Sequence, residues 1–95
     1  MIGVIAVLKV QPDKTSPFEA VFASLAEKVR ANEPGNLMYQ LTRARSEPGV
    51  YKVLEIYRDQ DALTHHGQTD YFKAAGGAMA PFMAARPEIE YLDAL

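Results

Sequence analysis

Residues 33–58, EPGNLMYQLTRARSEPGVYKVLEIYR, decide the fold of this chain. Glu33-Pro34-Gly35 is a turn signal that ends a preceding helix, and Glu47-Pro48-Gly49 is a second one that divides the stretch into two apolar segments. We predict that both segments are strands, at Asn36–Arg45 and Val50–Arg58, because β-branched and aromatic residues are frequent in them. The short connection between the two strands predicts a β-hairpin.

Further elements are predicted on both sides of this hairpin. In chain order they are a strand at Ile2–Val10, a helix ending near Asn32, the two hairpin strands, a short helical turn at Asp59–His66, a longer helix starting near Thr69, and a strand at Glu88–Leu95. Ser16 and Glu19 have the spacing of a capping box at the start of the first helix. The order βαββαβ predicts one α+β domain, residues 1–95, with a four-stranded antiparallel sheet and helices on one face.

Both faces of the predicted sheet are apolar. Along the first strand Val4, Ala6 and Leu8 alternate with Ile5 and Val7, which point to the opposite side. Two helices can cover only one face, so the other face needs a second cover. A second copy of the same sheet supplies one, and we therefore predict a homodimer without deciding which face it uses.

Composition excludes several classes of partner. Ten basic and twelve acidic residues give a net charge of −2, and no Lys/Arg run is present, so we expect no binding to nucleic acid. The chain has no apolar run long enough to span a membrane, and its apolar start lacks the features of a signal peptide. Cysteine is absent, which excludes disulfides and thiolate chemistry. We expect a cytoplasmic protein that does not associate with membranes.

The candidate catalytic residues are His66 and Glu55. His65 and His66 are the only histidines, and adjacent helical residues project about 100° apart, so at most one of them faces a pocket. The pair lacks the spacing of metal ligands, and we predict no metal site. Glu55 lies in an apolar strand, where a carboxylate is costly without a partner. It either orients His66 and raises its pKa, or it is a structural carboxylate bonded within the sheet or the dimer.

Aromatic and sulfur-containing side chains are the candidate ligand-binding residues. The predicted substrate-binding set is Tyr39, Tyr57, Tyr71, Phe72 and Met79. Tyrosine hydroxyls in an apolar pocket suit a planar phenolic or quinonoid ligand, although alternating tyrosines on strands also arise from ordinary sheet packing. Phe72 and Met79 lie on the apolar stripe of the last helix, where they serve the core or an adaptable pocket wall.

The stretch from Glu33 to Phe72 and the order of elements resemble the antibiotic biosynthesis monooxygenase family. The matching features of the later part are an acid at a helix start, an Ala-Leu pair, a histidine and a closing aromatic-Phe pair, here Asp59, Ala62-Leu63, His66 and Tyr71-Phe72. The resemblance extends from Val4 to Leu95. It implies a ferredoxin-like chain that pairs into a dimeric α+β barrel, with a pocket between the sheet and the helices of each copy.

Some members of that family oxygenate phenols, quinols or anthrones with molecular oxygen and no cofactor, and others degrade haem. The haem-degrading members use an Asn on the first strand, a Trp ending the third strand and a His on the second long helix. This chain has no Asn on its first strand, Tyr57 at the Trp position and Gly76 near the His position, which disfavours haem degradation. The Asn and Trp that polyketide-oxygenating members use on the third strand fall at Val53 and Tyr57.

The resemblance and the candidate residues together predict a cofactor-independent monooxygenase of the quinol type. In this hypothesis His66, oriented by Glu55, removes a phenolic proton, and Tyr57 and Tyr71 orient the aromatic ring. The alternative is a non-catalytic dimeric barrel that binds a small apolar metabolite.

Overall fold

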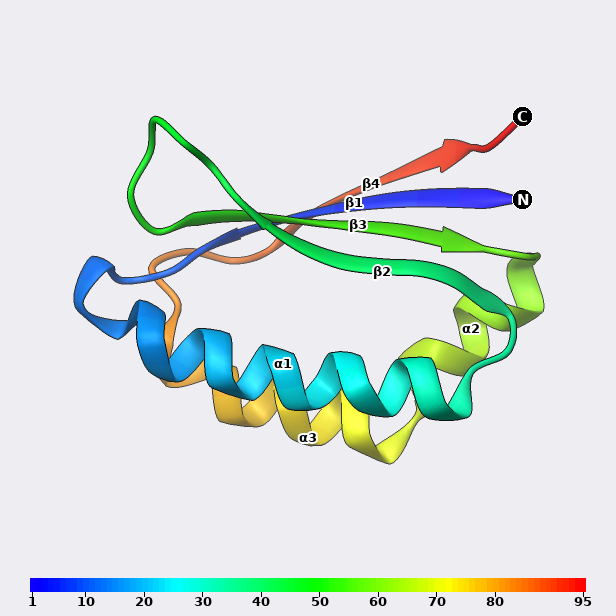
Figure 1. Cartoon of the computed structure of the whole chain (residues 1–95), viewed down its shortest axis with the longest axis horizontal. Coiled ribbons are helices and arrows are strands. Elements are labelled where there is room, and N and C mark those ends of the chain that lie inside the picture. The colour runs from blue at the N-terminus through cyan, green and yellow to red at the C-terminus, as the bar shows by residue number, and fades with distance from the viewer.

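The computed structural model describes all residues, 1–95, as a four-stranded sheet with its helices on one side (Figure 1). The elements are β1 (Ile2–Lys9), a 3₁₀ turn η1 (Pro12–Lys14), α1 (Thr15–Asn32), β2 (Asn36–Arg43), β3 (Val50–Tyr57), α2 (Gln60–Gln68), α3 (Asp70–Met79), a second 3₁₀ turn η2 (Ala80–Phe82) and β4 (Glu88–Asp93). The strand order is β2-β3-β1-β4, and every neighbouring pair is antiparallel. This is the predicted ferredoxin-like βαββαβ topology.

The register of the sheet determines which side chains share a face. Val4 of β1 lies opposite Glu55 of β3 and Tyr91 of β4, while Tyr39 of β2 lies opposite Glu55. Directly opposed residues in antiparallel strands point to the same side of the sheet. These four side chains therefore point toward the helices, and the residues adjacent to them in sequence point away.

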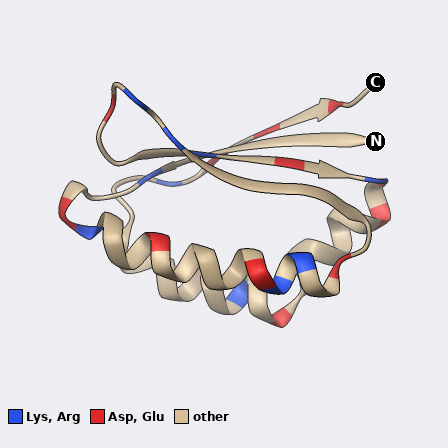
Figure 2. Ribbon diagram, viewed as in Figure 1, with Lys and Arg blue, Asp and Glu red and all other residues tan.

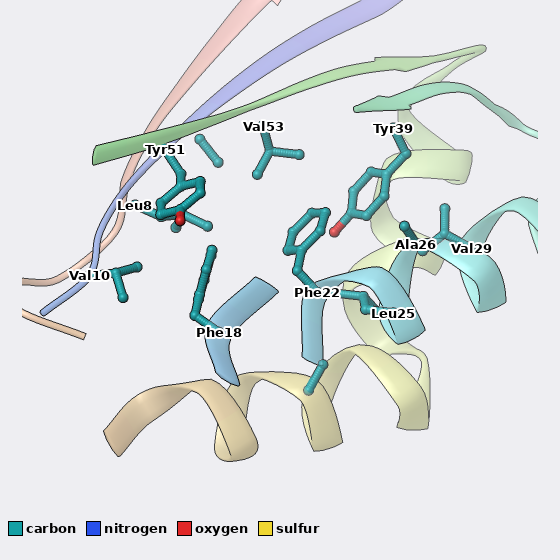
Figure 3. Close-up of a cluster of buried hydrophobic side chains, with 12 residues drawn as sticks. Leu8, Val10, Phe18, Phe22, Leu25, Ala26, Val29, Tyr39, Tyr51 and Val53 are labelled. Carbon is teal, nitrogen blue, oxygen red and sulfur yellow. The ribbon is translucent and has the colours of Figure 1, made fainter. Parts of the chain in front are cut away.

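The core lies between the sheet and α1. Phe18, Phe22, Leu25 and Val29 recur at the spacing of one face of a helix, and all four are buried. Figure 3 shows these side chains meeting Leu8, Val53, Tyr51 and Tyr39 from the sheet. The helix α3 packs beside α1, with Ala75 as its buried residue, and it completes the layer that covers this face.

The face of the sheet away from the helices has no cover in a single chain. We call its apolar side chains the far-face patch: Ile5, Val7, Met38, Leu54, Ile56 and Leu92. Met38 and Leu92 are 47% and 41% exposed, and the others are half-buried. The strand β4 is exposed along its whole length. None of the helices combines the length and hydrophobicity needed to cross a membrane.

The structure departs from the sequence predictions at the ends of elements. Each predicted strand is one or two residues too long at its carboxyl end, and the predicted turn at Asp59–His66 is a nine-residue helix. The capping box is wrong, because α1 begins at Thr15 without a side-chain cap. Glu19 instead accepts a hydrogen bond from the Tyr51 hydroxyl and pairs with Arg43, so its carboxylate faces the sheet. Long-range partners outcompeted the local cap.

Candidate active site

An open cavity of about 1020 Å³ lies between the sheet and the helices. Its lining is mostly apolar, with contributions from all three α-helices and from every strand of the sheet. The polar residues at the inner end are Glu55 and His66, whereas the β4 side opens past Tyr91, which is 64% exposed. A largely apolar hollow with a few convergent polar groups is the usual form of a small-molecule site.

The position of His66 follows from the way α2 begins. The Asp59 side chain caps α2 by accepting a hydrogen bond from the Ala62 N–H at 2.9 Å, and this bond lowers the pKa of Asp59. Ala62 then lies so close to the turn after α1 that a Cβ on Gly35 would come within 2.6 Å of its Cβ. Only glycine permits this approach. It brings His66, one turn further along α2, against the carboxyl end of α1.

Glu33, the residue that follows α1, binds His66. Both Glu33 carboxyl oxygens lie at hydrogen-bond distance from His66 Nδ1, at 3.0 and 3.1 Å. The Tyr71 hydroxyl of α3 donates to the same carboxylate at 2.5 Å. Burial and, to a smaller extent, this carboxylate raise the pKa of Tyr71 to about 12. The Glu33 and His66 side chains are 2% and 5% exposed. One carboxylate therefore ties together α1, α2 and α3.

This contact defines what the imidazole can do. A carboxylate only accepts hydrogen bonds, so Nδ1 is the ring nitrogen that donates to Glu33, and in the neutral imidazole Nε2 is the acceptor. Three aromatic rings enclose the imidazole, with centroid distances of 4.6 Å to Phe72, 5.2 Å to Tyr39 and 5.5 Å to Tyr57. Because His66 lines the cavity, its Nε2 is a fixed proton acceptor next to an apolar space. His65 is exposed, as its position 100° away requires.

Glu55 forms a second buried pair, with Tyr57. The Tyr57 hydroxyl donates to Glu55 Oε1 at 2.6 Å, and the other carboxyl oxygen has no hydrogen bond from the chain. Burial raises the pKa of Glu55 to about 7, the Tyr57 bond opposes that rise, and the nearby Glu33 adds to it. Glu55 is the only acidic residue of β3, and Figure 2 shows an acidic stretch toward the carboxyl end of that strand. A carboxyl with this pKa is partly protonated near neutral pH.

Tyr39 differs from the other buried tyrosines because its hydroxyl has no hydrogen-bond partner in the chain. Its ring is stacked on Phe22 at 5.4 Å and 12°, and it is only 5% exposed. Burial and the nearby carboxylates of Glu55 and Glu33 raise its pKa well above the ordinary value, so the hydroxyl keeps its proton. Figure 3 shows the hydroxyl directed into the space between sheet and helices.

The structure brings together most, but not all, of the predicted site residues. His66, Glu55, Tyr39, Phe72 and Met79 line the cavity. Tyr57 and Tyr71 do not line it. Their hydroxyls are instead bound to the buried carboxyl groups of Glu55 and Glu33, respectively. No group of three or more His, Cys, Asp or Glu side chains is arranged to hold a metal ion.

The predicted pairing of Glu55 with His66 is wrong, since Glu33 is the residue that binds the imidazole. Sequence reasoning missed Glu33 because an acid in a Glu-Pro-Gly turn is normally solvated, and nothing local indicates that this one is buried. The available signal was indirect. A glycine that a helix must approach closely marks a turn packed against another element.

An α+β domain with a buried histidine–carboxylate pair facing an apolar cavity defines a class of small-molecule binding or converting proteins. The family model described as "Antibiotic biosynthesis monooxygenase" matches residues 1–77. The chain belongs to this family, as the resemblance predicted. The crystal structure of a Caulobacter crescentus "putative antibiotic biosynthesis monooxygenase" is 68% identical, with a TM-score of 0.98, and the match covers 99% of this chain and 89% of that one.

Two curated relatives are more distant. The Bacillus subtilis "putative monooxygenase YcnE" is 34% identical over 77% of this chain and 76% of its own length. The Synechocystis protein sll1783 is 35% identical over 68% of this chain, but the match spans only 44% of that longer protein. The near-complete coverage of the Caulobacter chain, by contrast, confirms the fold over the whole length, from β1 to β4.

Proposed function

We propose that this protein is a monooxygenase that oxidises a small aromatic quinol, phenol or anthrone with molecular oxygen and without a cofactor. The observation that supports this most strongly is the state of His66. Its Nδ1 is held by Glu33 at 3.0 Å, and its Nε2 is left as the acceptor next to an apolar cavity. Family membership supports oxygen chemistry, and the aromatic side chains of the cavity favour a planar ring.

In the proposed reaction, His66 Nε2 removes a proton from a substrate hydroxyl or from an activated carbon. Glu33 stabilises the positive charge that forms on the imidazole, which is the role of a carboxylate behind a general base. The resulting anion is electron-rich, and the substrate supplies all four electrons that reduce O₂ to one product oxygen and one water. One oxygen atom enters the product and the other leaves as water, so an anthrone and O₂ give a quinone and H₂O.

The cavity supports this reaction through its largely apolar lining. Phe72 and Met79 of α3 and Val4, Ala6 and Leu8 of β1 give it apolar walls. In such surroundings a proton transfer and a charged intermediate are protected from competing reactions with water. The cavity volume of about 1020 Å³ is sufficient for a ring system of more than one ring.

We also propose that the working form is a homodimer. The far-face patch supports this, because six apolar side chains on one sheet face have no cover from the single chain, and two of them, Met38 and Leu92, are more than 40% exposed. The face that we assign to the second copy is the one opposite the helices. A dimer formed there leaves the cavity on the other side of the sheet in each copy.

Oxygen uptake tests the proposal. Protein dialysed against a chelator is assayed with an oxygen electrode on a panel of quinols, phenols and anthrones, together with His66→Ala and the matched control His65→Ala. We expect turnover without added cofactor, a loss of about 100-fold or more in His66→Ala, as for removal of a general base, and little change in His65→Ala. Binding of panel members with no oxygen uptake would instead support a non-catalytic binding protein. Equal effects of the two substitutions would remove His66 from the mechanism.

A further inference from the structure

Two hydrogen-bond donors lie beside the proposed base, and the proton transfer to His66 does not account for them. Tyr39 and Glu55 occupy directly opposed positions on β2 and β3, so their side chains leave the sheet next to each other. Both line the cavity, and the Tyr39 ring lies 5.2 Å from the imidazole. Each group has hydrogen-bonding capacity that no other residue of the chain uses. The Tyr39 hydroxyl has no partner, and Glu55 uses only Oε1.

These two polar atoms are open to the cavity rather than enclosed by the protein. Asn36 Nδ2 is the only fully buried side-chain polar atom that lacks a hydrogen-bond partner in the chain, so the Tyr39 hydroxyl and the second Glu55 oxygen are free to bind water or a ligand. Tyr39 cannot turn away to find water elsewhere, because its ring is stacked on Phe22 at an interplanar angle of 12°. The two groups are therefore placed to bind a ligand atom that accepts two hydrogen bonds. An oxygen that becomes negative during a reaction accepts such bonds most strongly.

We propose that the cavity catalyses the reversible enolisation of a cyclic ketone in the absence of oxygen, with Tyr39 and Glu55 donating hydrogen bonds to the carbonyl oxygen while His66 Nε2 takes the α-proton. This inference relies on the proposed function only for the role of His66 as base. It adds a substrate class, carbonyl compounds with an acidic α-hydrogen, and an activity that needs no oxidant.

The step balances without another reactant. The α C–H bond breaks and its proton goes to Nε2. The electron pair of that bond forms the new C=C bond, while the C=O π pair moves to the oxygen, which is held by the Tyr39 hydroxyl and takes its proton from Glu55. Reversal returns a proton from Nε2 to carbon. The substrate is neither oxidised nor reduced overall, because the formal changes at its two carbons cancel. In D₂O the proton on Nε2 exchanges with solvent, and the carbon then receives a deuteron.

The two donors fit this role because both keep a proton to donate. The high pKa of Tyr39 means that its hydroxyl keeps its proton near neutral pH. The raised pKa of Glu55, about 7, leaves a large fraction of the carboxyl neutral at the same pH. A neutral carboxyl and a tyrosine that share a substrate oxygen in an apolar site are a known physical solution for stabilising an enolate. Glu33 cannot replace them, since its oxygens are occupied by His66 and Tyr71.

The test measures hydrogen–deuterium exchange at carbon. The full-length protein is mixed with 2-tetralone in D₂O under nitrogen, and the loss of the α-hydrogen signals is followed by proton NMR against a buffer blank. We expect exchange faster than in buffer, a loss of about 100-fold in the protein-dependent rate for Tyr39→Phe, as for removal of one oxyanion donor, and a similar loss for His66→Ala. The matched control is Tyr51→Phe, which removes the hydroxyl of a buried tyrosine outside the cavity and should exchange like the wild type.

Glu55 needs a different comparison, because its removal leaves the Tyr57 hydroxyl buried without an acceptor. Tyr57→Phe is therefore the reference, and the double variant Tyr57→Phe/Glu55→Leu should lose at least a further tenfold in exchange rate. Circular dichroism establishes that each variant is folded. Wild-type exchange no faster than the buffer rate would overturn the inference. So would folded Tyr39→Phe protein that exchanges as fast as the wild type.

The same samples in air separate this inference from the proposed function. Exchange under nitrogen, combined with no oxygen uptake from the quinol panel, would uphold the enolisation site and refute the oxygenase. Oxygen uptake combined with no exchange would refute the enolisation site and leave the oxygenase standing.

Discussion

Replacing Glu55 with glutamine should change the free energy of unfolding by an amount that depends on pH and follows from the structure. Burial raises the pKa of Glu55 from 4.5 to about 7 in the folded protein. The unfolded chain therefore releases its proton first as the pH rises. The stability linked to this proton is fully present below about pH 4.5 and is lost by about pH 7. One pKa unit corresponds to about 1.4 kcal/mol, so wild-type stability falls by about 3 kcal/mol over this range.

The glutamine side chain removes the titration and keeps an oxygen that can accept the Tyr57 hydrogen bond of 2.6 Å. Urea unfolding of both proteins at one protein concentration, repeated across this pH range, gives the difference in unfolding free energy. We expect the Glu55→Gln protein to gain on the wild type by about 3 kcal/mol as the pH rises, with a plateau above pH 7. The control is Glu27→Gln, an exposed position on α1, for which the difference should stay constant.

Two results would refute this reasoning. A difference between Glu55→Gln and wild type that is independent of pH would mean that the carboxyl is as well solvated in the folded protein as in the unfolded chain. A difference that shrinks as the pH rises would mean that the folded protein favours the charged carboxylate. In either case Glu55 could not serve as a proton donor in the cavity.

Three further predictions concern the base, the cavity and the dimer. Glu33→Gln should lower the turnover of any active substrate by about tenfold or more, because the imidazole loses the carboxylate that fixes its tautomer; unchanged steady-state rates would contradict this. Gly76 lines the cavity, so a side chain at this position would enter it, whereas Gly77 does not line the cavity. A Cβ at either position would meet no atom within 4 Å, so both positions have room for a side chain. Gly76→Leu should therefore weaken ligand binding in calorimetric titrations, whereas Gly77→Leu should not, and both should gain about 1 kcal/mol of stability. Leu54→Asp in the far-face patch should give a monomer by sedimentation equilibrium, with Ser24→Asp on α1 as control; a Leu54→Asp dimer would exclude this face.

The fold could be predicted from the sequence because its signals are local and agree with one another. Pro34-Gly35 and Pro48-Gly49 mark the hairpin, and the spacing from Phe18 to Val29 marks the buried side of α1. The last helix begins next to Thr69, which caps α3, and Pro81 follows its last turn. Errors remained where distant partners intervene. The carboxylate of Glu19 has a local role available at the start of α1, but Tyr51 and Arg43 bind it instead.

The site was only partly predictable for the same reason. The buried position of His66 followed from helical geometry and the family spacing, and the unusual character of Glu55 followed from its place in an apolar strand. The identity of the partner of His66 did not follow. Glu33 is 33 residues away in the chain, and only the packing of α2 on the turn brings the two together. Strand parity placed Tyr57 on the cavity side, but it does not show that Glu55 takes up the Tyr57 hydroxyl.

The contact between Gly35 and Ala62 joins two residues that do not line the cavity. An alanine at residue 35 would place its Cβ 2.6 Å from that of Ala62, and Ala62 is itself anchored to Asp59 by the hydrogen bond that caps α2. Neither side can yield easily. Gly35→Ala is thus a lesion that Ala62→Gly should suppress, and a genetic selection begun from the first change would be expected to recover the second. The position of His66 therefore depends on two residues together, Gly35 in the turn after α1 and Ala62 one turn before the histidine in α2.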